Sequence, residues 1–317
     1  MNKNNIIYTP TETYSKPPKT FAEQVSILES RGMAVADRRF AEELLQETGY
    51  YRLSAYMLPF KQRNANDEII DLFQPGTTIE KVHNLYQFDN DLRLLVFSAI
   101  ECIEVSLRSQ IVYQLSHKYG SHWQDNPSVF SHKLPRVDIF NELQSHIADQ
   151  MARSTEVFIN HYKSKYITPA NPPSWMIIET TYFRHLSLIC ANLAKRADLV
   201  DIALYYDLPP AEFCSWLHGI NSVRNVCAHH GRLWNRDIGT APRVLRFSKN
   251  RKWLANPGAE HTDRLYYTLC TINYFLQTLK LADDFVCNVQ NLLSQYPDIP
   301  LAPMGFTNDW RNETIWK

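Results

Sequence analysis

The chain has 317 residues, of which 44% are hydrophobic and 12% aromatic, enough to bury the core of one large domain or two ordinary ones. Basic and acidic residues number 33 each, so no global field attracts a polyanion, and any nucleic-acid contact must depend on a local basic patch. The six cysteines lie far apart, without a CxxC pair or a secretory leader, so we expect reduced thiols and a cytoplasmic protein. No apolar run approaches the roughly 20 residues that span a bilayer, so we expect no membrane contact.

The first part of the chain predicts a flexible arm followed by a small helical module. Residues 1–19 are polar and contain prolines, which is typical of an arm. Apolar residues then recur at three- and four-residue intervals, and hairpin signals such as Asn-Gly are absent, so the whole chain is expected to be all-α. We assign 20–76 to an N-terminal helical module, in which Thr20 and Glu23 form a capping box and Gly32 ends the first helix.

The remaining residues, 77–317, predict a helical bundle with a C-terminal tail packed on its outside. Four long amphipathic segments supply its helices, and the first of them has the longest helical signal. They cover residues 77–120, 172–197, 208–231 and 263–296.

Polar residues with chemical potential gather in "VRNVCAHHGRLWNR", residues 223–236, at the end of the third segment. At about 100° per residue, Arg224, Asn225 and His229 share one arc of the helix. His230 falls among the apolar positions by the same count. We therefore expect the first three side chains to open onto one cleft and His230 to be turned inward.

An arginine, an asparagine and a histidine without an acid suit RNA cleavage that needs no metal and no cofactor. The guanidinium holds a phosphodiester, the imidazole moves protons near neutral pH, and the RNA supplies its own 2′-hydroxyl nucleophile. An ordinary polar helix end is the plainer interpretation, because His and Arg favour the C-terminal end of a helix dipole. A metal site built from Cys227, His229 and His230 is disfavoured, because these residues point to different sides of a helix.

The segment "RNVCAH" fits the R-x4-H pattern of the HEPN superfamily, and "RNVCAHHGRLWNR" resembles the Abi-like proteins of bacterial abortive infection within it. "GYYRLSAYMLPF", "RSQIVYQLSHKYGSHW", "PPSWMIIETTYF" and "YPDIPLAPMGFTNDW" resemble the same family in the same order, from about residue 17 to 316. Arg184-His185 depart from the expected pattern of a glycine and an uncharged residue.

The resemblance implies a HEPN-type bundle and a metal-independent endoribonuclease that acts in phage defence or in a toxin–antitoxin system. Arg224 and His229 take the catalytic positions, and Asn225 takes the polar position after the arginine. The resemblance also implies a homodimer whose paired motifs form one cleft, and an RNA partner as substrate and possible antitoxin.

Two further groups of residues each have a plain and a functional interpretation. Glu101, Glu104 and Arg108 form either a helix-surface ion pair or a set of side chains, with His230, that orients the motif. The basic segment 242–253, interleaved with Phe247 and Trp253, is either a solvated loop or a grip for RNA. The residues assigned to RNA binding are Arg232, Arg243, Arg246, Lys249, Arg251 and Lys252. A non-catalytic RNA-binding or protein-interaction scaffold is the alternative function.

Overall fold

The computed structural model describes residues 13–131, 138–257 and 262–317. In this part of the chain the fold is all-α, as predicted, with twelve α-helices and one two-stranded sheet. Most of the predicted arm, residues 1–12, lies outside the described residues, and residues 13–19 are exposed without regular structure. None of the described helices is long and apolar enough to cross a membrane.

The chain divides into two compact units, the first of which ends at Gln87. The first unit contains α1 (Phe21–Ser30), α2 (Arg38–Thr48), α3 (Tyr50–Met57), β1 (Lys61–Arg63), β2 (Ile69–Phe73) and the start of α4 (Ile79–Tyr119). The predicted capping box is present, since Thr20 accepts from the Glu23 backbone N–H and Glu23 accepts from that of Thr20. The antiparallel β1–β2 pair was not predicted, because its strands are too short to give an alternating pattern.

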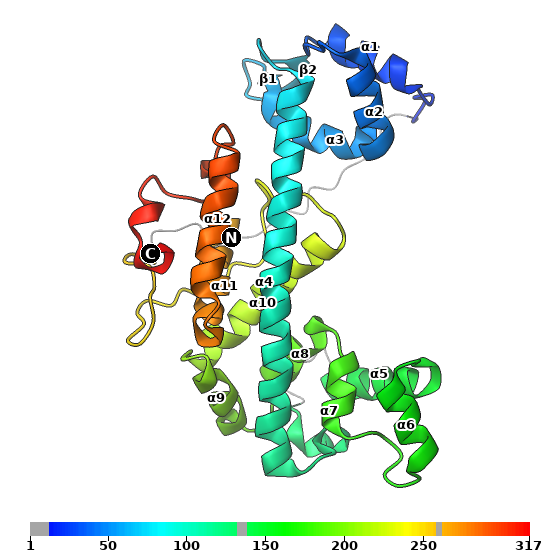
Figure 1. Cartoon of the computed structure of the whole chain (residues 1–317), viewed down its shortest axis with the longest axis vertical. Helices are drawn as coiled ribbons and strands as arrows, with labels where there is room; N and C mark the ends of the chain where they lie inside the picture. The colour runs from blue at the N-terminus through cyan, green and yellow to red at the C-terminus, as the bar shows by residue number, and fades with distance from the viewer. Residues whose placement is uncertain (1–12, 132–137, 258–261) are drawn as a thin grey trace. The chain divides into compact units, whose positions relative to one another are not determined.

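The second unit, 88–317, contains the rest of α4 and all the later helices. These are α5 (Ile139–Arg153), α6 (Val157–Lys165), α7 (Ser174–Ile177), α8 (Phe183–Ala191), α9 (Arg196–Tyr205), α10 (Pro210–Ala228), α11 (Leu265–Leu279) and α12 (Ala282–Gln295). Figure 1 shows α10, α11 and α12 beside this part of α4. α11 is buried on all sides from Leu265 to Leu276, so it is the central helix of the unit.

The apolar stripe predicted for the long helix forms the side of α4 that faces the core. Five of its members are fully or almost fully buried, and Ala99 is 8% exposed. The five are Leu92, Val96, Ile103, Leu107 and Ile111. The three- and four-residue spacing is therefore sufficient to identify this face.

Two predicted single helices are each divided in the structure. Segment 263–296 breaks where Lys280 takes a left-handed conformation, φ 60°, so that α11 and α12 are separate helices. Segment 172–197 breaks at Thr181, which has extended backbone between a short 3₁₀ turn and α8. Both predictions of continuous helices were wrong, because apolar spacing continued through the breaks without a proline or glycine to mark them.

The unexpected Arg184-His185 pair joins α8 to α5. Arg184 donates to Glu142 Oε2 at 2.6 Å, and this hydrogen bond lowers the pKa of the Glu142 carboxyl. The His185 ring lies 5.5 Å from that of His146, and burial lowers the pKa of both histidines. The departure from the family pattern is therefore used in packing two helices.

Candidate functional site

The predicted motif lies at the C-terminal end of α10, where the chain forms a Schellman turn. The His230 backbone N–H donates to the Cys227 carbonyl at 3.0 Å, and the Gly231 N–H donates to the Val226 carbonyl at 2.8 Å. His229 is the C-cap, and His230 takes the left-handed conformation, φ 54°, that usually favours glycine at this position. The motif therefore starts on a helix and ends on a tight turn.

This turn corrects the prediction that His230 points inward. The helical-wheel angle assumed that the helix continues to residue 230, but α10 ends at Ala228. Both His229 and His230 are exposed in the structure. His230 is therefore not a core histidine placed behind the motif.

Arg224, on the last two turns of α10, faces α4. Its Nε atom lies 4.0 Å from Glu104 Oε2, and its guanidinium carbon lies 5.6 Å from the centre of the Phe97 ring. Together these groups border an open pocket of about 220 Å³, here named the Arg224 pocket. Its lining residues are Phe97, Ile100, Glu101, Glu104, Val105, Arg108 and Arg224.

The charged groups that line this pocket are the guanidinium groups of Arg108 and Arg224 and the carboxylates of Glu104 and of exposed Glu101. Arg108 forms an ion pair with Glu104 and donates a hydrogen bond to the Thr181 carbonyl at 2.9 Å. The Nε atoms of Arg108 and Arg224 are buried and donate no hydrogen bond within the described chain. The structure thus brings the three predicted α4 residues to the motif arginine.

The other motif residues are not in this pocket. Asn225 is half-buried on α10, and exposed His229 follows the last helical residue. Cys227 is buried, which raises the pKa of its thiol to about 12 and makes it a poor metal ligand. Among the described residues, no group of three His, Cys, Asp or Glu side chains is arranged to hold a metal ion.

Sequence reasoning missed a buried ion pair on α4 that holds the chain after the motif. The Asp89 side chain is 0% exposed and pairs with that of Arg93, which is 6% exposed. Asp89 Oδ1 accepts from the backbone N–H groups of Leu233, at 2.9 Å, and of Trp234. The available signal was an acid and an arginine four residues apart among the apolar positions of a core helix.

The predicted basic segment is an irregular loop along another face of α10. The Arg243 backbone N–H donates to Ser215 Oγ at 2.9 Å, and Pro242 packs against Gly219. These two α10 positions are about half a turn around the helix from Arg224. The loop is therefore not part of the Arg224 pocket.

The side chains of this loop differ in their exposure. Four cations and Phe247 are exposed: Arg243, Arg246, Lys249 and Lys252. Arg251 lies over the Tyr274 ring at 5.7 Å, and Lys252 Nζ donates to the Lys317 backbone carbonyl. Trp253 is 5% exposed and stacks on Trp216 at 5.0 Å, so its predicted place among the RNA-stacking aromatics was wrong. Arg232, in the motif turn, is half-buried, and its backbone carbonyl accepts from Arg236.

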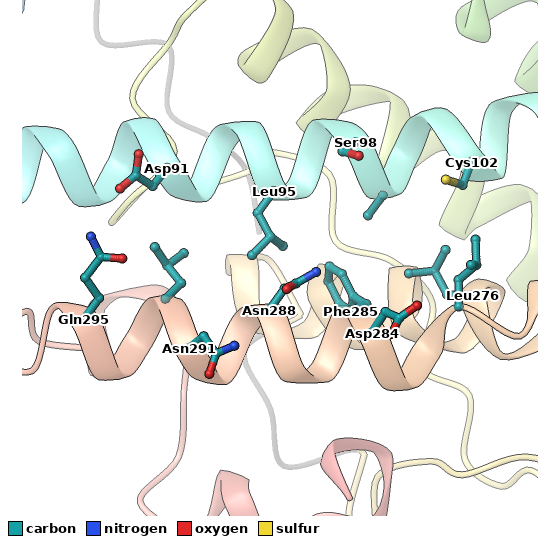
Figure 2. Close-up of a pocket in the computed structure, with 13 residues that line it drawn as sticks. Asp91, Leu95, Ser98, Cys102, Leu276, Asp284, Phe285, Asn288, Asn291 and Gln295 are labelled. Atoms are coloured by element: carbon teal, nitrogen blue, oxygen red, sulfur yellow. The ribbon is translucent and has the colours of Figure 1, made fainter.

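A larger pocket, of about 490 Å³, lies between α4 and α12 (Figure 2). Figure 2 shows Leu95 pointing toward α12 and the side chains of Asn288 and Phe285 facing α4. Its lining includes the carboxylates of Asp91 and Asp284 and, within the described chain, no basic side chain. Since a phosphate needs cationic or N–H donors, the smaller Arg224 pocket is the better candidate for an anion.

Comparison with known proteins gives one match. A family model described as Abi-like protein matches residues 43–235, which is more than half of the chain. The matched range includes α4, α10 and the motif turn, and it ends before the basic loop. No curated protein and no solved structure matches the chain.

Proposed function

Because the chain belongs to the Abi-like protein family, we propose that it is a metal-independent endoribonuclease of HEPN type. Its role would be abortive infection against phage, or the toxin function of a toxin–antitoxin pair. RNA in the cytoplasm would be its substrate, and an RNA could also neutralise it.

The observation that carries this proposal is the arrangement around Arg224. Its guanidinium borders an open pocket with that of Arg108, and the Nε of each arginine has no hydrogen-bond partner among the described residues. His229, five residues further on, is exposed and available for proton transfer. A guanidinium holds phosphate oxygens with several donors at once, and an imidazole exchanges protons near neutral pH.

The chemistry that fits these groups is attack by the RNA 2′-hydroxyl on the adjacent phosphorus. A bond forms between O2′ and phosphorus, and the bond between phosphorus and O5′ breaks. The 2′-hydroxyl proton passes to a base, and the leaving O5′ takes a proton from an acid. Arg224 would stabilise the extra negative charge on the phosphate in the transition state. The products are a cyclic 2′,3′-phosphate and a 5′-hydroxyl.

One acid and one base are needed, and each chain has a single R-x4-H motif. A two-fold homodimer with facing motifs would supply two His229 side chains to one cleft. The exposed Arg243, Arg246 and Lys249, with Phe247, would grip the RNA beyond the cleft, because cations pair with phosphates and aromatic rings stack on bases.

A non-catalytic RNA-binding or protein-interaction scaffold is the second candidate. The observation in its favour is Glu104, whose carboxylate lies 4.0 Å from Arg224 and already balances part of its charge. In such a scaffold the Glu104–Arg224 contact would only join α4 to α10.

The decisive experiment incubates the purified full chain with total RNA and EDTA and maps the ends formed. Cleavage should persist in EDTA and leave cyclic 2′,3′-phosphate and 5′-hydroxyl ends, and RNA with a 2′-deoxy sugar at the cut should resist. A requirement for Mg²⁺, or 3′-hydroxyl ends, would reject the mechanism.

Variants then assign the roles. His229→Ala should slow cleavage about 10²- to 10⁴-fold with RNA binding largely intact, as expected for loss of general acid–base catalysis. Arg224→Ala should weaken both cleavage and binding. His218→Ala is the matched control, because His218 is exposed on the same helix outside the motif.

A monomer in solution that still cleaves RNA would reject the proposed homodimer.

A further inference from the structure

We infer that Asp89 is a positioning residue for the proposed cleavage reaction: its carboxylate fixes the chain just after the motif and so holds the turn that carries His229 in place against α4. The inference rests on the proposed function.

The geometry leaves the motif turn little freedom. Its first end is fixed by the Schellman hydrogen bonds of α10, and its second end is fixed at Leu233 by Asp89. Only residues 229–232 lie between these anchors. Leu233 and Trp234 are buried, and Trp234 Nε1 also donates to the Pro300 carbonyl at 3.1 Å. A displacement at Leu233 must therefore pass into the turn that carries the histidines.

Helix α4 contacts the chain on both sides of His229. Glu104 on α4 contacts Arg224, and Asp89, fifteen residues earlier on α4, accepts from the chain that follows His229. Because α4 is continuous from Ile79 to Tyr119, the two contacts are a fixed length apart. Arg224 and His229 are both carried by the end of α10, where the His229 N–H donates to the Asn225 carbonyl at 3.0 Å. Asp89 and Glu104 therefore hold this helix end and the turn after it in place against α4.

A carboxylate suits this position better than a neutral acceptor. Asp89 receives N–H groups of two successive residues and the guanidinium of Arg93, so both of its oxygens are used. Arg93 also donates to Asn90 Oδ1 at 3.1 Å, which orients the guanidinium along α4. Without an acceptor here, two buried backbone N–H groups would lose their partners.

The experiment compares two double variants that differ in whether an acceptor remains. Asp89→Leu with Arg93→Leu removes both charges and every acceptor, and such apolar replacement of a buried ion pair often leaves a folded protein. Asp89→Asn with Arg93→Gln also removes both charges but keeps an amide oxygen for the loop. The leucine pair should lower the cleavage rate constant at saturating RNA about 10²-fold with little change in KM, and the amide pair should retain most of the rate.

Asp198→Ala is the control for loss of a buried carboxylate elsewhere on the same unit. Asp198 is 2% exposed and accepts from Lys118 and Tyr119 at the other end of α4. This variant should keep the wild-type rate constant wherever it is folded. An equal fall in Asp198→Ala and in the leucine pair would overturn the positioning role, because it would show a general effect of stability.

Hydrogen exchange of the Leu233 and Trp234 amides gives a readout that does not depend on catalysis. Both amides should exchange faster in the leucine pair than in wild type or in the amide pair. Faster exchange with an unchanged cleavage rate would overturn the positioning role alone. A wild-type chain that cleaves no RNA would overturn the proposed function, and the positioning role with it.

Discussion

α4 carries two acid–arginine pairs with the same four-residue spacing, and they differ in what surrounds them. The Asp89–Arg93 side chains are 0% and 6% exposed, and backbone N–H groups complete the hydrogen bonds of the carboxylate. The Glu104–Arg108 side chains are 12% and 17% exposed and open onto the Arg224 pocket. The same local motif is therefore sealed inside the protein at one place and borders an open pocket at the other.

The two pairs differ in whether neighbouring hydrogen-bond donors lack a partner. Buried polar groups are normally paired, so an unpaired one is a reason to look for a ligand. Around Glu104, the Nε atoms of Arg108 and Arg224 are buried without a hydrogen bond in the described chain. The Asp89 pair is therefore closed by its own hydrogen bonds, and the surroundings of Glu104 are the place to test for a ligand.

The largest expected effect is on stability. Asp89→Ala should lower the free energy of unfolding by about 3–5 kcal/mol, because it removes the carboxylate that pairs with buried Arg93 and accepts from the Leu233 and Trp234 N–H groups. Glu104→Ala should lower it by less than Asp89→Ala does, since the side chains of the Glu104–Arg108 pair keep some contact with water. Urea unfolding followed by circular dichroism measures both, and similar losses for the two variants would contradict the distinction.

The next effect is on RNA binding by the open pair. Glu104→Gln, in the cleavage-deficient His229→Ala background, should tighten RNA binding about fivefold at low salt, because a carboxylate that repels phosphate is removed. Glu101→Gln is the matched comparison and should tighten binding less, because Glu101 lines the same pocket but is exposed, so that water screens its charge. Weaker binding by Glu104→Gln would mean that the carboxylate mainly orients Arg224.

A smaller effect on the free energy of unfolding is expected at His230, in the turn that follows α10. His230→Gly should raise the free energy of unfolding by up to about 1 kcal/mol, because glycine adopts the left-handed conformation without a steric cost. His229→Gly is the control: His229 has φ −93°, so glycine there should destabilise. If His230→Gly destabilises as much as His229→Gly, interactions of the His230 side chain outweigh its backbone strain.

The smallest effect is a pH dependence of the α5–α8 packing. Burial lowers the pKa of His146 and His185, so the folded protein binds fewer protons than the unfolded chain in mildly acidic solution. The stability present above the unfolded histidine pKa is therefore lost as pH falls. The thermal midpoint should fall between about pH 7.5 and about pH 5, and it should fall less in His146→Gln/His185→Gln. An equal fall in that variant would assign the effect to other groups.

Much of this architecture could be predicted from local pattern. The buried face of α4 followed its apolar spacing, and α10 begins at Pro210 as the proline pair indicated. The pattern also placed Glu104 and Arg108 on one side of α4, where they meet Arg224. These features depend on residues within a few turns of one another, so the sequence by itself determined them.

The tertiary structure decided the rest, because the forces involved join distant residues or act at breaks in periodicity. Asp89 finds its N–H partners 144 residues further along the chain, which no local spacing can reveal. His230 leaves the core because the Schellman turn ends the helical count before it. Trp253 is buried by Trp216 although it follows a run of cations. In each case a long-range contact or a backbone conformation overrode the periodicity that the sequence displays.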